Sequence, residues 1–145
     1  MTIKETQEEI ISEFAAFDDW LDKYNHLIEL GKKLPPLDQK LKTEDNLIRG
    51  CQLKVWFHST FKDGKVFFEV DSASTITQGI IFLLIRILSG QAPAEIKNAD
   101  LYFIDKIGLR ENFSPSRANG LYKMERQMKL DAAHYETELK AGEGG

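Results

Sequence analysis

Cysteine is nearly absent from this chain of 145 residues, which contains one. One cysteine cannot form an intramolecular disulfide, and an iron–sulfur cluster held by this chain alone would need several thiolates. Histidine is also scarce, and His26, His58 and His134 lie far apart in the sequence, without the spacing of metal ligands. We therefore expect no metal, no resident cofactor and a reducing compartment, the cytoplasm.

Long apolar runs and an excess of basic residues are lacking as well. The densest apolar run, residues 80–88, includes Arg86 and is far shorter than the roughly 20 residues of a membrane span. The chain begins without the apolar segment of a signal peptide. The net charge is −4 and the pI about 5.4, with no basic stripe of the kind that nucleic-acid binding needs. Membrane and nucleic-acid partners are therefore not expected.

Two common catalytic patterns are missing too. Gly-x-Gly occurs only at residues 142–144, away from any strand-to-helix turn, so no phosphate-binding loop is indicated. His58 follows Cys51 by seven residues, roughly 23 Å along an extended strand at about 3.3 Å per residue. This spacing gives no support to a Cys-His nucleophile pair of a hydrolase.

Periodic apolar positions and capping residues predict the secondary structure. Helices are expected from residue 3 to 17, over 20–31, over 76–88, in a short segment from 93, over 100–107 and from 115 to 139. Strands are expected at 47–48, 52–61 and 66–71, with Asp63-Gly64 as the hairpin turn between the last two. Gly79 lies inside an apolar helix, which indicates close packing against another element.

This order of elements predicts an α+β fold with a small antiparallel sheet of about three strands, covered by helices mainly on one face. The element order is helices, strands, helices. We expect a single domain over residues 1–140 and a disordered tail over residues 141–145.

The lone thiol lies in the stretch Arg49-Gly50-Cys51-Gln52, between a glycine and a predicted strand. Gly50 can adopt a positive φ, so the chain can turn and present the thiol at a corner. Arg49 and Lys54 lie close in sequence, and cations favour the nucleophilic thiolate. The alternative is a buried cysteine that acts only as a small hydrophobe. A thiolate without base, metal or cofactor can still attack a persulfide on another protein and keep its outer sulfur.

Ser114-Pro115-Ser116-Arg117 is the second informative stretch, because Ser114 is a natural N-cap and Pro115 a natural first helical residue. A cation in the first turn of a helix is unfavourable for the helix dipole. We therefore interpret Arg117 as a residue with another task, support of the thiol site. The alternative is a surface arginine or one half of a salt bridge.

Four blocks of sequence resemble the SufE family of sulfur-acceptor proteins, over nearly the whole chain. They are Trp20–Leu34 with its Leu-Gly-x-x-Leu-Pro end, Arg49-Gly50-Cys51-Gln52 followed by Val55-Trp56, Asp71-Ser72 with Gly79, and Ser114-Pro115-Ser116-Arg117 followed by Gly120-Leu121. Two departures stand out. Leu53 replaces the serine that usually follows the thiol motif, and Ala73 or Ser74 replaces a second aspartate after Asp-Ser.

The resemblance implies that Cys51 takes persulfide sulfur from a PLP-dependent, SufS-like cysteine desulfurase and stimulates it. The sulfur then passes to a downstream scaffold protein on which iron–sulfur clusters are assembled. The chain would be a covalent carrier, a monomer or weak homodimer, rather than a stand-alone enzyme. Gly50 and Gln52 would form the mobile loop, beside an apolar hollow that shields the thiol. The remaining implied site residues are Arg117 as support and Arg49, Asp71 and Ser72 as partner contacts.

Two other hypotheses remain open from the residues. The chain could be a non-catalytic scaffold of the same pathway with Cys51 incidental, or a one-cysteine redox protein. Incubation with a desulfurase and cysteine would distinguish the three. Sulfur added to Cys51 favours the carrier, and no change favours the scaffold. Ready sulfenic acid formation with peroxide favours the redox protein.

Overall fold

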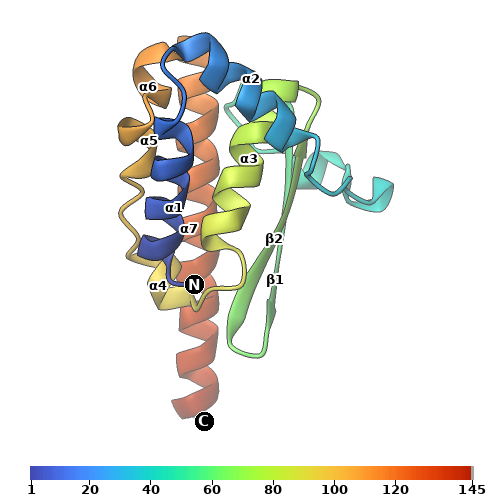
Figure 1. Ribbon diagram of the computed structural model, residues 1–145. Helices are drawn as coiled ribbons and strands as arrows, with labels where there is room; N and C mark the ends of the chain where they lie inside the picture. Colours follow the sequence, from blue (N-terminus) through green and yellow to red (C-terminus); the bar gives the residue numbers. More distant parts are fainter. Residues whose placement is uncertain (145) are drawn as a thin grey trace.

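The computed structural model describes residues 1–144, and the chain forms helices around one β-hairpin (Figure 1). In chain order the elements are α1 (Ile3–Ala15), α2 (Trp20–Gly31), the 3₁₀ helices η1 (Gln39–Leu41) and η2 (Glu44–Asn46), β1 (Val55–Lys62), β2 (Lys65–Ser72), α3 (Thr75–Leu88), α4 (Pro93–Lys97), α5 (Phe103–Lys106), α6 (Leu109–Asn112) and α7 (Pro115–Gly144). The α+β class is confirmed. The two 3₁₀ helices between α2 and the hairpin and the short helix α6 are additions to the predicted order.

The sheet has two strands among the described residues, so the prediction of about three strands is wrong. β1 and β2 pair antiparallel from Val55↔Ser72 to Lys62↔Lys65. The expected strand at residues 47–48 amounts to one isolated bridge, Leu47↔Trp56, with the Ile48 amide donating to the Val55 carbonyl at 3.0 Å. The pairing stops there because the chain turns at Gly50 and leaves the sheet.

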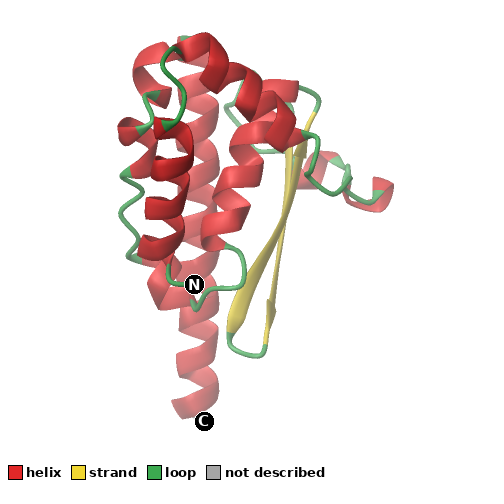
Figure 2. Ribbon diagram, in the orientation of Figure 1, coloured by secondary structure: helices red, strands yellow, loops and turns green. Residues whose placement is uncertain are grey.

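The hairpin turn follows the prediction. Asp63 and Gly64 both have positive φ, 55° and 76°, as a two-residue turn with the twist of the flanking strands requires. The hairpin lies along one side of the longer helices, as Figure 2 shows. This arrangement agrees with helices placed mainly on one face of the sheet.

The side chains of α7 cover the outer edge of β1. Ser59 Oγ donates to Asp131 at 2.7 Å, Tyr135 Oη donates to the Ser59 carbonyl at 3.1 Å, and the rings of Phe61 and Tyr135 stack with centroids 5.2 Å apart. An open strand edge exposes unpaired backbone groups that invite aggregation. Here Tyr135 of α7 donates to one such carbonyl, and this hydrogen bond holds α7 against the sheet.

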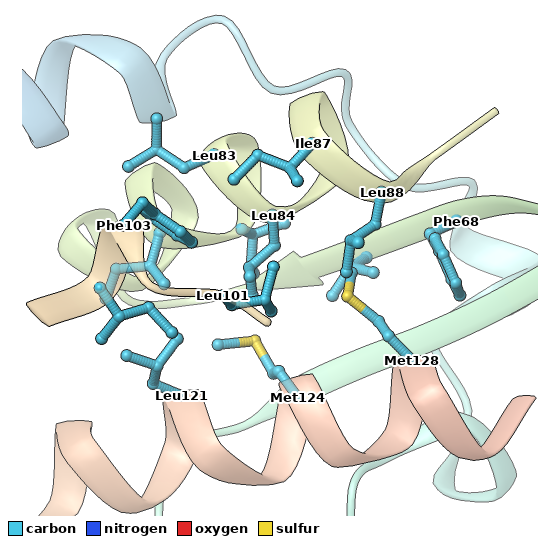
Figure 3. Close-up of a cluster of buried hydrophobic side chains, with 14 of the residues drawn as sticks. Phe68, Leu83, Leu84, Ile87, Leu88, Leu101, Phe103, Leu121, Met124 and Met128 are labelled. Atoms are coloured by element: carbon cyan, nitrogen blue, oxygen red, sulfur yellow. The ribbon is translucent and has the colours of Figure 1, made fainter. Parts of the chain in front are cut away.

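The core lies between α3 and its neighbours. Leu84 and Leu88 of α3 are fully buried, and Met124 and Met128 point from α7 towards them (Figure 3). Full burial of such a side chain contributes about 1.5–3 kcal/mol. The packing of α3 against α7 therefore positions the start of α7, which carries the second informative stretch.

Gly79 provides the close approach that the sequence predicts. A Cβ built on Gly79 would lie 2.1 Å from the Leu27 carbonyl oxygen, and one on Gly31 would lie 2.8 Å from the Gly79 amide nitrogen. α2 ends at Gly31, as expected. Gly31 does not have the positive φ of a helix-terminating glycine, so the close contact with α3 is the reason for glycine at this position.

The spacings Thr2–Glu5 and Thr75–Gln78 in the sequence each predict a capping box. Thr2 and Glu5 form theirs at the start of α1. The N-cap of α3 is Ser74 rather than Thr75, and the Gln78 amide donates instead to the Ser72 carbonyl at 2.8 Å. The long amide side chain reaches back to the end of β2, so it is not available for the capping box.

Helix α7 runs to Gly144, beyond the predicted end at residue 139. Gly145, the last residue of the expected tail 141–145, lies outside the described residues, and the disorder of that tail stays a prediction. None of the described helices combines the length and the apolar character that crossing a membrane would need.

Candidate functional site

The structure brings the two informative stretches of the sequence together. The loop after Gly50 lies against the first turns of α7, where Ser116, Asn119, Gly120 and Lys123 all contact or adjoin it. These positions are spaced i, i+3, i+4 and i+7, so they share one face of the helix. The thiol loop and the start of α7 therefore form one site.

Two side chains of α7 hold the loop on either side of Cys51. Asn119 Nδ2 donates to the Gly50 carbonyl at 3.2 Å, and Ser116 Oγ donates to Gln52 Oε1. Residues 52–54 are drawn away from the sheet by these contacts, which explains why β1 begins at Val55 and not at the predicted Gln52. The loop is thus held by side-chain hydrogen bonds at an exposed surface, each of which is weak.

Gly50 has the conformation that the sequence predicts, with φ of 76°. A side chain at this φ would be strained, and a β-branched one most of all. A Cβ at this residue would also lie 3.4 Å from Lys123 Nζ. The turn at Gly50 is therefore matched to glycine by its backbone conformation, and the Lys123 ammonium lies beside it at ordinary contact distance.

The Cys51 thiol is half-buried and lies beside α7. A Cβ built on Gly120 would be 3.4 Å from both Cys51 Sγ and Leu53 Cδ1, so the bare backbone of Gly120 provides the floor for both side chains. Leu53 packs against the core together with Cys51. Leu53, which stands where the family usually has serine, is therefore an apolar neighbour of the thiol and shields it from solvent on one side.

Arg117 lies in the first turn of α7, as predicted, with its guanidinium 5.8 Å from the ring centroid of Tyr24 in α2. Its backbone amide donates to the N-cap Ser114 Oγ at 3.4 Å. The side chains of residues 1–141 form no ion pair or side-chain hydrogen bond with this guanidinium. The cation–π contact leaves the donors of Arg117 available, and its role as support of the thiol stays a prediction.

The predicted partner contacts divide into two groups. Arg49 is exposed beside the loop. Asp71 and Ser72 are buried, with 6% and 3% of their surface exposed. Asp71 accepts from the Ser72 amide at 2.8 Å and from Gln78 at 3.3 Å, and it pairs with Lys42 at 3.4 Å. These two side chains therefore position the start of α3, and their contact with a partner stays a prediction.

None of the three histidines lies against the thiol. His26 Nε2 is 2.8 Å from Glu13, His134 Nε2 is 3.1 Å from Glu138, and His58 Nδ1 is 3.8 Å from Glu69. In the part of the chain that the structure describes, no cluster of histidine, cysteine and acidic side chains is arranged to hold a metal ion. The site therefore offers thiol exchange as its chemistry, without a histidine as general base.

Sequence reasoning missed the residues that hold the loop. Ser116 and Gly120 belong to the resemblance blocks but received no role, and Asn119 and Lys123 were not singled out. Their helical spacing after Ser114 is visible in the sequence. Only the packing of α7 reveals that this face meets the loop.

Comparison with known proteins identifies the family. Residues 8–132 match the SufE family model, described as an Fe-S metabolism associated domain. An uncharacterised SufE-like protein of Rhizobium meliloti is 39% identical over 130 residues, covering 86% of this chain and 93% of that protein. The sulfur acceptor protein CsdE of Escherichia coli is 37% identical over 118 residues, covering 80% of each chain.

A solved structure has the same fold. The solution structure of a hypothetical protein from Thermus thermophilus superimposes with a TM-score of 0.74 at 22% identity, over 91% of this chain and 96% of the other. The family match covers most of the chain and includes both stretches that form the site. The chain therefore belongs to the SufE family, a family associated with Fe–S metabolism.

Proposed function

We propose that this protein is a sulfur carrier that takes persulfide sulfur from a PLP-dependent cysteine desulfurase onto Cys51 and passes it towards iron–sulfur cluster assembly. The observation that carries the proposal is the position of the only thiol. Cys51 lies at a Gly50 turn, half-buried, in a loop that two exposed hydrogen bonds hold on α7. The relative CsdE, named a sulfur acceptor, supports the same chemistry.

The transfer needs a nucleophilic thiolate and no further catalyst. The Cys51 thiolate attacks the outer sulfur of the persulfide on the desulfurase cysteine. The bond between the two sulfurs of the donor breaks, and its electron pair stays on the donor cysteine as a thiolate. Cys51 then carries the persulfide, and no net oxidation or reduction has occurred. The same step, with a thiolate of the acceptor as the nucleophile, delivers the sulfur onward.

This step also explains how the carrier would stimulate the desulfurase. Removal of the outer sulfur restores the donor thiolate, so the enzyme can turn over again. The reaction needs a free thiol, which is maintained in a reducing compartment, and we place the protein in the cytoplasm.

The loop contacts explain how the carrier would protect its cargo. While the hydrogen bonds from Asn119 and Ser116 persist, Cys51 stays half-buried beside Leu53. An outward turn at Gly50 would present the thiol to a docked donor. We therefore expect slow labelling of Cys51 in the isolated protein and faster labelling with a desulfurase bound.

Mass spectrometry of the protein after incubation with a cysteine desulfurase and cysteine tests the proposal. We expect one or more sulfur atoms added to Cys51, and faster cysteine turnover by the desulfurase. Cys51→Ser should abolish both effects while the fold is kept. No added sulfur on the wild-type protein, or full stimulation by Cys51→Ser, would contradict the carrier function. Stimulation by Cys51→Ser would instead indicate a scaffold.

A further inference from the structure

A polar groove of about 550 Å³ begins next to the thiol loop, between residues 45–49, β1 and α7. Arg49, two residues before Cys51, and Lys123, beside Gly50, both line it, and Arg126 lies one turn further along α7. The groove carries these charged side chains together with the apolar Leu47 and Ile48. Its lining therefore points to recognition of a charged group.

The charge of this groove is not balanced by the protein itself. Among the described side chains, those of residues 1–141, no ion pair or side-chain hydrogen bond of Arg49, Lys123 or Arg126 is found, whereas other basic side chains pair with acids, as Arg86 does with Glu9 and Glu13. Two acids also line the groove, Asp45 and Asp131.

Asp131 already accepts hydrogen bonds from Ser59 at 2.7 Å and Gln127 at 2.8 Å. These donors are neutral, so the groove lining carries three cations and two carboxylates, a net positive charge in a protein whose net charge is −4.

An exposed apolar strip continues this groove along α7. Tyr122 and Leu130 are 55% and 52% exposed, and they lie four residues before and after Arg126, on one face of the helix. A second hollow of about 380 Å³ contains both of them and shares Arg126 and Leu130 with the groove. The strip covers about 12 Å along the helix, at about 1.5 Å per residue.

We propose that these residues form a docking surface for the desulfurase, which binds through an acidic segment with apolar side chains. The α7 docking surface consists of Arg49, Tyr122, Lys123, Arg126 and Leu130. The inference rests on the proposed function, since the partner is the donor that delivers sulfur to Cys51. Tyrosine and arginine are enriched among residues that dominate protein interfaces. Two large exposed apolar side chains beside the cations favour a protein segment over a small anion.

The location of this surface fits its task. Arg49 belongs to the thiol loop, and Lys123 lies against Gly50, so a segment bound in the groove touches the loop from the side on which the chain turns. Cations on the surface also attract an acidic partner before contact, which raises the association rate at low salt.

The experiment measures binding of a fluorescently labelled cysteine desulfurase to this protein in the Cys51→Ser background, so that no sulfur is exchanged. We expect Arg126→Glu to raise the Kd about tenfold, and Leu130→Ser to raise it about threefold or more. The effect of Arg126→Glu should shrink in about 0.5 M salt, because screening weakens exposed charges. Lys106→Glu, an equal change at an exposed lysine of α5 outside both hollows, should leave the Kd unchanged.

A second measurement separates the docking surface from the carrier function. With Cys51 intact, Arg126→Glu should raise the desulfurase concentration needed for half-maximal persulfide formation, with the maximal rate kept. Equal Kd values for Arg126→Glu and Lys106→Glu, with melting curves that show both folded, would overturn the docking surface even if Cys51 still accepts sulfur. Salt-sensitive binding without sulfur on Cys51 would refute the carrier function and leave the docking surface intact.

Discussion

Removal of the two hydrogen bonds that hold the thiol loop should expose Cys51 without unfolding the protein. The double variant Ser116→Ala/Asn119→Ala deletes the donors to Gln52 Oε1 and to the Gly50 carbonyl. Alanine favours helix at both positions, so α7 should be kept. The perturbation therefore acts on the equilibrium between the loop on α7 and the loop in solvent.

The expected size of the effect follows from the number and exposure of these bonds. Both bonds lie at the exposed surface, where a hydrogen bond contributes about 0.5–1 kcal/mol. Together they stabilise the closed loop by about 1–2 kcal/mol, which corresponds to about a 5- to 30-fold change in the open population. If labelling proceeds from the open loop, its rate should rise by the same factor.

The assay is the rate of iodoacetamide labelling of Cys51, followed by mass spectrometry and compared with a model thiol peptide at the same pH. The wild-type protein should react more slowly than the peptide, and the double variant should approach it. Ser12→Ala/Asn25→Ala, at exposed positions of α1 and α2, is the matched control and should label as wild type does.

Two results would refute the reasoning. Wild-type labelling as fast as the peptide would show that the closed loop does not shield the thiol. Equal labelling of the double variant and the wild type would show that the two bonds do not hold the loop.

Three further predictions concern Arg117, the helix contact and pH. Arg117→Ala should slow sulfur transfer to the thiol with little change in melting temperature, and transfer at the wild-type rate would exclude it from the site. Gly79→Ala should lower stability to urea by about 1–3 kcal/mol, because its Cβ would lie 2.1 Å from a backbone carbonyl of α2; an unchanged urea midpoint would contradict this. Glu136→Gln should lower the melting temperature at pH 7 and lower it less at about pH 3. Hydrogen bonds from Lys97 and Lys140 lower the pKa of Glu136, so its stabilisation is present at neutral pH and disappears as pH falls through that pKa. An equal difference at both pH values would refute the assignment.

Local rules in the sequence determined much of the fold. The capping box at Thr2, the cap of α2, expected at Asp18 or Asp19 and found at Asp19, and the turn at Asp63-Gly64 depend on residues within a few positions of each other, and each is present. Gly79 also indicated a close contact, because a glycine inside an apolar helix needs a packing reason. The thiol turn at Gly50 is local in the same sense, and its positive φ is confirmed.

Tertiary packing alone decided the third strand, the cap of α3 and the surroundings of the thiol. The segment after Leu47 could pair with β1 by its pattern, but the loop is drawn onto α7 by Ser116 and Asn119, more than 60 residues away in the sequence. The burial of Asp71 and Ser72, both predicted as partner contacts, is likewise a result of packing, and Lys42 and Gln78 contact Asp71. Contacts between distant segments depend on how whole elements pack, and no local spacing in the sequence specifies which helix face meets a given loop.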